Sequence, residues 1–130
     1  MRSRNPIVVE RQNPRKDLTI ALKEGTARLQ AGISLIVFPQ STRASSFDPQ
    51  AFNSIGEKMA RHSGVPIVPV ALKTDAWGQG RLIKEIGVFN PAKTIHYRFA
   101  KPVRVDGNAK NIHVEICSFI ASALQEWNSG

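Results

Sequence analysis

The fold of this chain is decided by residues 33–43, which read ISLIVFPQSTR. The first six residues form an apolar run, interrupted only by Ser34, that lies between Gly32 and Pro39. Such a run is typical of a strand that is buried on both faces in a parallel sheet. We therefore predict a central strand over residues 33–38 and a polar loop after it.

Signals for helices and strands alternate on both sides of this stretch. Asn13-Pro14 and Asp48-Pro49 each combine a capping side chain with a proline suited to the first helical position. They predict helices that run to about Gly32 and Gly64, where glycine ends a helix in the left-handed conformation. Further strands are expected at residues 7–9, 65–72 and 94–99, and a last helix at residues 108–127.

Apolar residues at helical spacing give each predicted helix one buried face. These residues are Leu18, Leu22, Gly25 and Leu29; Phe52, Ile55, Met59 and Ala60; and Ile112, Ile116, Ile120, Leu124 and Trp127. The alternating order predicts an α/β fold with a mainly parallel central sheet flanked by helices. The first strand has nothing before it to pair with, so we expect residues 1–130 to be part of one larger domain.

The composition limits the classes of partner. An apolar fraction of 42% is enough for a packed core, and the net charge of +8 points to nucleic acid, an anionic membrane surface or a phosphate-bearing small molecule. No nucleic-acid-binding motif is present, and the few aromatic residues are not interleaved with basic ones, so nucleic acid is not expected. The longest apolar run is far shorter than the roughly 18 residues of a membrane-spanning helix.

The cysteine and histidine content excludes several kinds of site. Cys117 is the single cysteine, so an internal disulfide cannot form, and we interpret it as a core residue on the last helix. The three histidines are scattered, without cysteine or carboxylate at metal-ligand spacing. We therefore expect neither a metal ion nor a bound cofactor.

The loop after the predicted central strand carries the candidate chemistry. Gln40, Ser41, Thr42 and Arg43 follow the carboxyl end of that strand, where open α/β sheets bind ligands. The guanidinium of Arg43 can grip a phosphate bidentately, and the two hydroxyls and the loop N–H groups can bind its other oxygens. An ordinary turn with a solvated arginine is an equally good interpretation of these residues alone.

Three segments resemble the 1-acylglycerol-3-phosphate acyltransferases and related glycerolipid acyltransferases. Phe38–Arg43 is similar to the Phe-Pro-Glu-Gly-Thr-Arg block of that family, and residues 64–72 are similar to its Gly-Val-Pro-Ile-Val-Pro-Val segment. Upstream, residues 8–11 followed by Lys16 resemble the strand-plus-arginine block. The order and spacing of the three segments agree with the family, and the resemblance covers residues 7–103.

The resemblance implies a reaction and a set of ligands. The family transfers a fatty acyl group from acyl-CoA or acyl carrier protein to a glycerol hydroxyl of a lysophosphatidate-like acceptor. By this resemblance, Arg43 and Arg11 bind the acceptor phosphate, and Thr42, with Ser41 and Gln40, supports the loop or bonds the phosphate. It also implies a peripheral location on the cytoplasmic side of a membrane, where the early basic cluster would meet anionic lipid.

The chain departs from the family at three points. The catalytic His-x-x-x-x-Asp pair is absent, because residues Ile67, Lys101 and Ser118 lie five positions after the three histidines. No catalytic residue is therefore assigned, and we expect this chain to be a carboxy-terminal part of such an enzyme or an inactive relative. Gln40 and Ser41 also replace the Glu and Gly of the family's loop. A non-catalytic module that binds phospholipid or phosphate is the alternative function.

Overall fold

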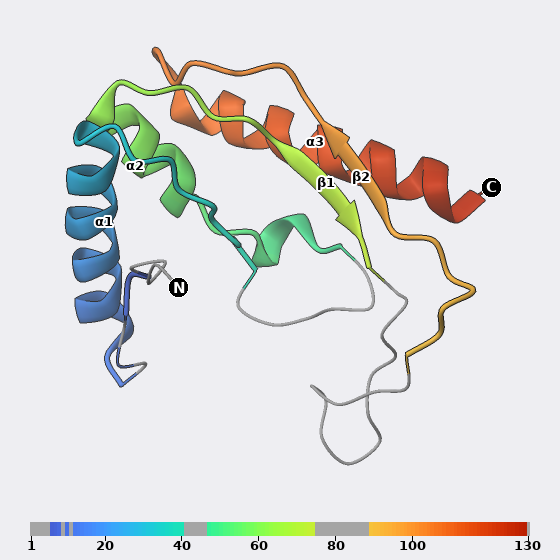
Figure 1. The fold of residues 1–130 in the computed structure, drawn as a ribbon. Helices are drawn as coiled ribbons and strands as arrows, with labels where there is room; N and C mark the ends of the chain where they lie inside the picture. The colour runs from blue at the N-terminus through green and yellow to red at the C-terminus, as the bar shows by residue number, and fades with distance from the viewer. Residues whose placement is uncertain (1–5, 9, 11, 41–46, 75–88, 130) are drawn as a thin grey trace.

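The computed structural model describes residues 6–8, 10, 12–40, 47–74 and 89–129. Its elements, in chain order, are α1 (Pro14–Gln30), the 3-10 helix η1 (Pro49–Ala51), α2 (Ile55–Ser63), β1 (Val70–Lys73), β2 (His96–Phe99) and α3 (Ala109–Ser129). The two strands lie against α3, and α1 packs beside α2 at the other end of the molecule (Figure 1).

The helix ends follow from local sequence and confirm the predictions made there. The side chain of Asn13 accepts hydrogen bonds from the backbone N–H groups of Arg15 and Lys16, each at 3.2 Å, and so caps α1. Gly32 and Gly64 follow α1 and α2 with φ of +80° and +68°, the left-handed conformation in which a side chain would be strained.

The predicted helix that starts at Pro49 is divided in two, which corrects the sequence interpretation. The chain leaves helical geometry at Phe52, whose φ and ψ are −85° and 108°. The cause lies outside this segment: both the backbone N–H and the side-chain amide of Asn53 donate to the carbonyl oxygen of Pro39, at 3.1 and 2.6 Å. These bonds hold Asn53 against the end of the preceding extended segment, so α2 begins only at Ile55.

β1 and β2 form an antiparallel pair with Val70 opposite Phe99 and Leu72 opposite Tyr97. The pairing continues beyond the regular strands, because Ile67 and Val103 exchange both backbone hydrogen bonds, at 2.8 and 2.7 Å. Pro69 has no N–H to donate, and this interrupts the predicted strand over residues 65–72. The described part of the chain contains this one antiparallel ladder, and the mainly parallel central sheet stays a prediction.

The apolar run 33–38 is not a buried strand in this structure, and this corrects the central prediction. The segment is extended but pairs with none of the described strands. Leu35 and Val37 are half-buried and lie near Gly25 of α1 and Gly56 of α2. The residues that alternate with them point outward, so that Ile36 is 85% and Phe38 78% exposed. An extended segment that has helices on only one side buries only one of its faces.

The core lies between α3, α2 and the sheet. It is made of Ala60, Ala71, Val105, Ile112, Ile116, Ile120 and Ala123. The predicted buried face of α3 is thus confirmed at its three isoleucines, while Leu124 and Trp127 are half-buried against the same core. Each buried isoleucine contributes about 1.5–3 kcal/mol relative to an exposed one.

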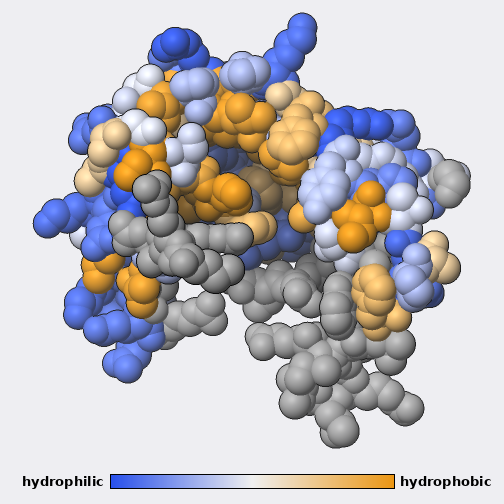
Figure 2. Space-filling view, viewed as in Figure 1, coloured by the Kyte–Doolittle hydropathy of each residue, from blue (hydrophilic) through white to orange (hydrophobic). Residues whose placement is uncertain are grey.

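The sheet face that turns away from α3 is apolar and exposed. The opposed pairs Val70–Phe99 and Leu72–Tyr97 lie on this face, and each of the four residues is exposed. Figure 2 shows apolar side chains gathered on the same side of the molecule. Of the described helices, none is long and apolar enough to cross a bilayer.

Candidate functional site

Four of the five residues predicted to bind phosphate lie outside the described residues: Arg11, Ser41, Thr42 and Arg43. Their roles therefore stay predictions. The fifth, Gln40, is half-buried at the end of the extended segment. The structure does, however, describe the residues that flank the 41–46 segment on both sides.

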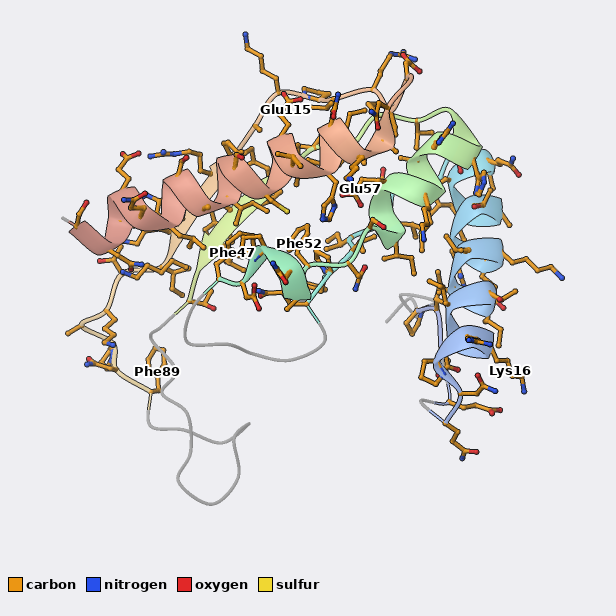
Figure 3. All side chains as sticks on the ribbon, turned by 180° about the vertical axis from the view of Figure 1, so that it is seen from behind. Lys16, Phe47, Phe52, Glu57, Phe89 and Glu115 are labelled. Atoms are coloured by element: carbon orange, nitrogen blue, oxygen red, sulfur yellow. The ribbon has the colours of Figure 1, made fainter. Side chains whose placement is uncertain are left out.

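The described residues on either side of this segment, Pro39 and Phe47, are held next to the start of α2. At one end, Asn53 holds the carbonyl of Pro39 as described above. At the other, the ring of Phe47 lies edge-on to that of Phe52, with centroids 5.6 Å apart (Figure 3). Asp48 then caps η1 by accepting from the N–H of Gln50 at 2.9 Å. Residues 39 and 47 are therefore held beside two consecutive residues, Asn53 and Phe52.

The amino terminus of α2 follows these anchors directly. The side-chain oxygen of Asn53 accepts from the N–H of Ile55, the first residue of α2, at 3.2 Å, so one side chain bonds both the start of α2 and Pro39. The first turn of a helix carries unpaired N–H groups and a partial positive charge, which favour an anion. The residues that flank the predicted phosphate loop thus lie beside a helix end whose partial positive charge suits an anion.

A second set of polar residues lies between α2 and α3, and the sequence interpretation missed it. The carboxylate of Glu57, only 4% exposed, points from α2 toward α3 (Figure 3). Its Oε1 lies 2.6 Å from Nδ1 of His113, and Nε2 of His113 lies 3.7 Å from Sγ of Cys117. Burial, and to a smaller degree the charge of Glu57, raise the pKa of the Cys117 thiol.

Part of the signal for this cluster was present in the sequence. His113 and Cys117 are four residues apart on the predicted last helix, so one face carries both. Glu57 is distant in sequence, and only the packing of α2 on α3 brings it to the histidine. The ring of Phe52 lies 5.8 Å from that of His113, centroid to centroid, and this connects the cluster to the anchors of the 41–46 segment.

A third polar set fixes the carboxyl end of α3 to the sheet. The guanidinium of Arg98 donates to both carboxylate oxygens of Glu126, at 2.6 and 3.0 Å, and lies over the ring of Trp127. His96 stacks on the same ring, that of Trp127, with the two ring centroids 5.1 Å apart. His96 is half-buried in this stack. These contacts attach the end of α3 to β2.

No three of the described histidines, cysteines and carboxylates are arranged to hold a metal ion. Surface hollows among the described residues include two small ones. The larger, about 150 Å³, lies between the sheet and α3 and is lined by Pro69, Ala100, Lys101, Val103, Glu115, Ile116 and Phe119. It is well below the roughly 300–1,000 Å³ of a typical ligand site.

Comparison with curated proteins finds a partial relative. Over 66 residues, or 51% of its length, the chain is 30% identical to the 1-acyl-sn-glycerol-3-phosphate acyltransferase of Pseudomonas aeruginosa. The aligned stretch covers 26% of that enzyme, about a quarter of its length. No protein-family model matches the chain, and no solved structure matches it. The partial similarity supports a relationship to acyltransferases.

Proposed function

We propose that this chain is the acceptor-binding part of a glycerolipid acyltransferase. The enzyme would transfer a fatty acyl group from acyl-CoA or acyl carrier protein to 1-acylglycerol-3-phosphate or a similar phosphate-bearing acceptor. The observation that carries the proposal is the 30% identity to an enzyme named for this reaction. The sequence PQSTR and the anchoring of its loop beside the start of α2 support the same assignment.

In this proposal the residues divide into phosphate ligands and supports. Arg43 grips the phosphate bidentately, Arg11 adds a second charge, and Ser41 and Thr42 fill the remaining oxygens. Gln40 supports the loop. Holding the phosphate also positions the acceptor hydroxyl, which is the main contribution that a binding region makes to rate.

The proposal is tested by the binding of a short acceptor. Isothermal titration of the chain with 1-hexanoylglycerol-3-phosphate and with uncharged 1-hexanoylglycerol measures the contribution of the phosphate. We expect binding of the phosphate form only. Losing a hydrogen-bonded charge costs about 1.5–3 kcal/mol, so Arg43→Ala should lower affinity about 10–100-fold. Arg43→Lys should restore part of it, because lysine offers a point charge without the planar fork.

Arg61→Ala is the matched control, since Arg61 is an exposed arginine of α2 and its loss changes the net charge equally. If Arg43→Ala weakened binding no more than Arg61→Ala, the phosphate-site assignment would be wrong. Equal affinity for the two ligands would contradict the proposal as a whole.

The absence of a His-x-x-x-x-Asp pair favours a second candidate, a module that binds phospholipid or phosphate without catalysis. Neither candidate should turn over acyl-CoA and lysophosphatidate as this chain alone, because general-base catalysis typically contributes about 10²–10⁴-fold. They differ in what the gene encodes upstream: an in-frame segment with a His-x-x-x-x-Asp pair would support the acyltransferase part over the phosphate module.

We also propose that the chain works at the cytoplasmic surface of an anionic membrane. Arg15 and Lys16 are exposed at the start of α1, after the basic residues of the amino terminus. Lys16 Nζ lies 3.9 Å from a carboxylate oxygen of Glu10, and both side chains are exposed. Basic residues near an anionic surface contribute about 1 kcal/mol each. Co-sedimentation should therefore show binding to phosphatidylglycerol vesicles that salt reverses. Equal binding to phosphatidylcholine vesicles would contradict it.

A further inference from the structure

Glu57, His113 and Cys117 lie in one line across the contact between α2 and α3. The carboxylate of Glu57 bonds Nδ1 of the imidazole at 2.6 Å, and Nε2 on the opposite side of the ring lies 3.7 Å from the sulfur of Cys117. Both distances are within hydrogen-bonding range for the atoms involved. A nucleophile, a base and an acid that orients the base therefore occur in the order used by acyl-transferring triads.

We propose that these three residues form a thiol site at which Cys117 accepts an acyl group from an acyl thioester. His113 is the general base, and Glu57 is the positioning residue that orients the imidazole. The choice of an acyl thioester as the donor rests on the proposed function. The proposed chemistry makes no use of Arg43.

Glu57 sets the direction of the proton transfer. A carboxylate accepts the hydrogen of Nδ1, so the lone pair of the neutral imidazole stays on Nε2, the nitrogen that faces Cys117. Burial of a carboxylate costs several kcal/mol, and an apolar residue of similar size would often stabilise such a position as well or better. Core packing alone therefore does not account for a glutamate at this position.

The chemical step is a transthioesterification. Nε2 of His113 takes the proton of Cys117, and Sγ attacks the carbonyl carbon of the donor to form a tetrahedral intermediate. The bond between that carbon and the donor sulfur then breaks, and the departing thiolate takes the proton back from Nε2. The products are an S-acylated Cys117 and a free thiol, and the histidine returns to its initial state.

The surroundings of Cys117 decide how the thiol can react. Burial raises its pKa, so the sulfur carries its proton at neutral pH and attacks only when a base removes it. Cys117 is 7% exposed, whereas the His113 side chain keeps 24% of its surface, so a donor would reach the sulfur past the imidazole. The half-buried ring of Phe52 lies beside the imidazole of His113, and the ring of Phe47 packs against Phe52. These two rings offer apolar contact to an acyl chain.

The test is the mass of the intact chain after incubation with hexanoyl-CoA. We expect one hexanoyl group per chain, located on Cys117 by peptide mapping and removed by neutral hydroxylamine, as a thioester should be. Cys117→Ala should abolish the adduct. His113→Gln should lower the initial rate of labelling by about 10²-fold or more, the usual contribution of a general base. Glu57→Gln keeps a hydrogen-bonding group but loses the charge, so it should retain an intermediate rate.

His62→Gln is the matched control, because His62 is an exposed histidine of α2 that should not affect labelling. The absence of an adduct on wild-type Cys117 would overturn the proposal without recourse to any variant. So would labelling of folded His113→Gln at the wild-type rate. Binding of 1-hexanoylglycerol-3-phosphate, measured on the same samples, separates the two proposals. If no adduct forms but the acceptor still binds, the thiol site alone is refuted. If an adduct forms but the acceptor does not bind, the thiol site is supported and the acceptor assignment is refuted.

Discussion

Gly25 of α1 faces Met59 of α2 so closely that a Cβ added at Gly25 would lie 2.5 Å from the sulfur of Met59. Real Cβ atoms do not approach other atoms so closely, so any side chain at position 25 must displace Met59, which is buried. The two helices thus approach each other over a glycine. This contact holds α1 to the part of the molecule that carries the 33–40 segment.

Gly25→Ala should therefore destabilise the chain, although alanine favours helix by about 1 kcal/mol over glycine. Overpacking typically costs about 1–3 kcal/mol, and Met59 is buried, so a cost of about 2 kcal/mol less the helix gain of about 1 kcal/mol leaves a net loss near 1 kcal/mol. Urea denaturation measures it. In a Met59→Ala background the same substitution should become neutral or stabilising, because the clash is gone.

Gly56→Ala on α2 is the control for helix propensity. A Cβ there would meet Val37 at 3.9 Å, an ordinary van der Waals distance, so alanine should stabilise by a few tenths to about 1 kcal/mol. If both glycine variants changed stability equally, the close approach of α1 to α2 would not exist in solution.

The next prediction concerns the segment where sequence and structure differ most. Phe38 is 78% exposed and Ile116 is 5% exposed, although sequence alone predicts that both are buried. Phe38→Ser should change the free energy of unfolding by no more than about 0.5 kcal/mol, as surface substitutions do. Ile116→Ala should cost about 2–5 kcal/mol. A cost above 2 kcal/mol for Phe38→Ser in urea denaturation would mean that the central buried strand forms after all.

The features that sequence predicted correctly depend on neighbouring residues. The cap at Asn13, the glycines that end α1 and α2 and the apolar face of α3 are all decided within a few positions of the chain. Their energetics are contained in capping bonds, backbone conformation and helical periodicity. Sequence can therefore place them without knowledge of the rest of the fold.

The features that sequence missed depend on distant residues. The run 33–38 has the composition of a buried strand, but burial on both faces requires neighbouring strands and a second layer, which the described residues do not supply. The break at Phe52 results from the bond between Asn53 and Pro39, and the triad requires Glu57 to meet a helix more than fifty residues later. The phosphate loop was predicted from motif and position, and its residues 41–43 lie outside the described structure.

The pair Arg98–Glu126 should make stability depend on pH in the acid range. The hydrogen bonds from Arg98, and then its charge, lower the pKa of Glu126 from its ordinary value of 4.5. A carboxylate with a lowered pKa in the folded state stabilises the fold above its unfolded pKa, and this stabilisation is lost as pH falls through the folded value. The excess stability of wild type over Glu126→Gln should therefore be largest near neutral pH and shrink below about pH 4.5.

Thermal unfolding at a series of pH values measures this difference. Glu115→Gln is the charge-matched control on the same helix, because Glu115 is exposed and makes no ion pair with any of the described residues. A difference between wild type and Glu126→Gln that did not change between pH 7 and pH 3 would show that the ion pair does not form in solution.

The last prediction links the fold to the proposed acceptor site through Asn53. Its side chain makes two bonds of different kinds: the amide nitrogen donates to the carbonyl of Pro39 at 2.6 Å, and the amide oxygen accepts from the N–H of Ile55 at 3.2 Å. The first bond holds Pro39, and the second bonds the residue at which α2 begins. Asn53→Ala removes both, whereas Asn53→Asp keeps an oxygen that can accept from Ile55 and places a carboxylate against the carbonyl of Pro39.

The two variants should therefore rank differently in stability and in binding. Asn53→Ala loses both side-chain hydrogen bonds, each of which contributes about 0.5–1.5 kcal/mol, so it should be the less stable variant. In affinity for 1-hexanoylglycerol-3-phosphate the order should be wild type, then Asn53→Ala, then Asn53→Asp. The reason is that the carboxylate both repels the Pro39 carbonyl and adds a negative charge near the phosphate. Losing one neutral hydrogen bond of about 0.5–1.5 kcal/mol corresponds to roughly a 2–10-fold weaker affinity for Asn53→Ala. Titration calorimetry on folded variants measures this order. Unchanged affinity in Asn53→Asp would mean that the acceptor does not bind at the loop that Asn53 anchors.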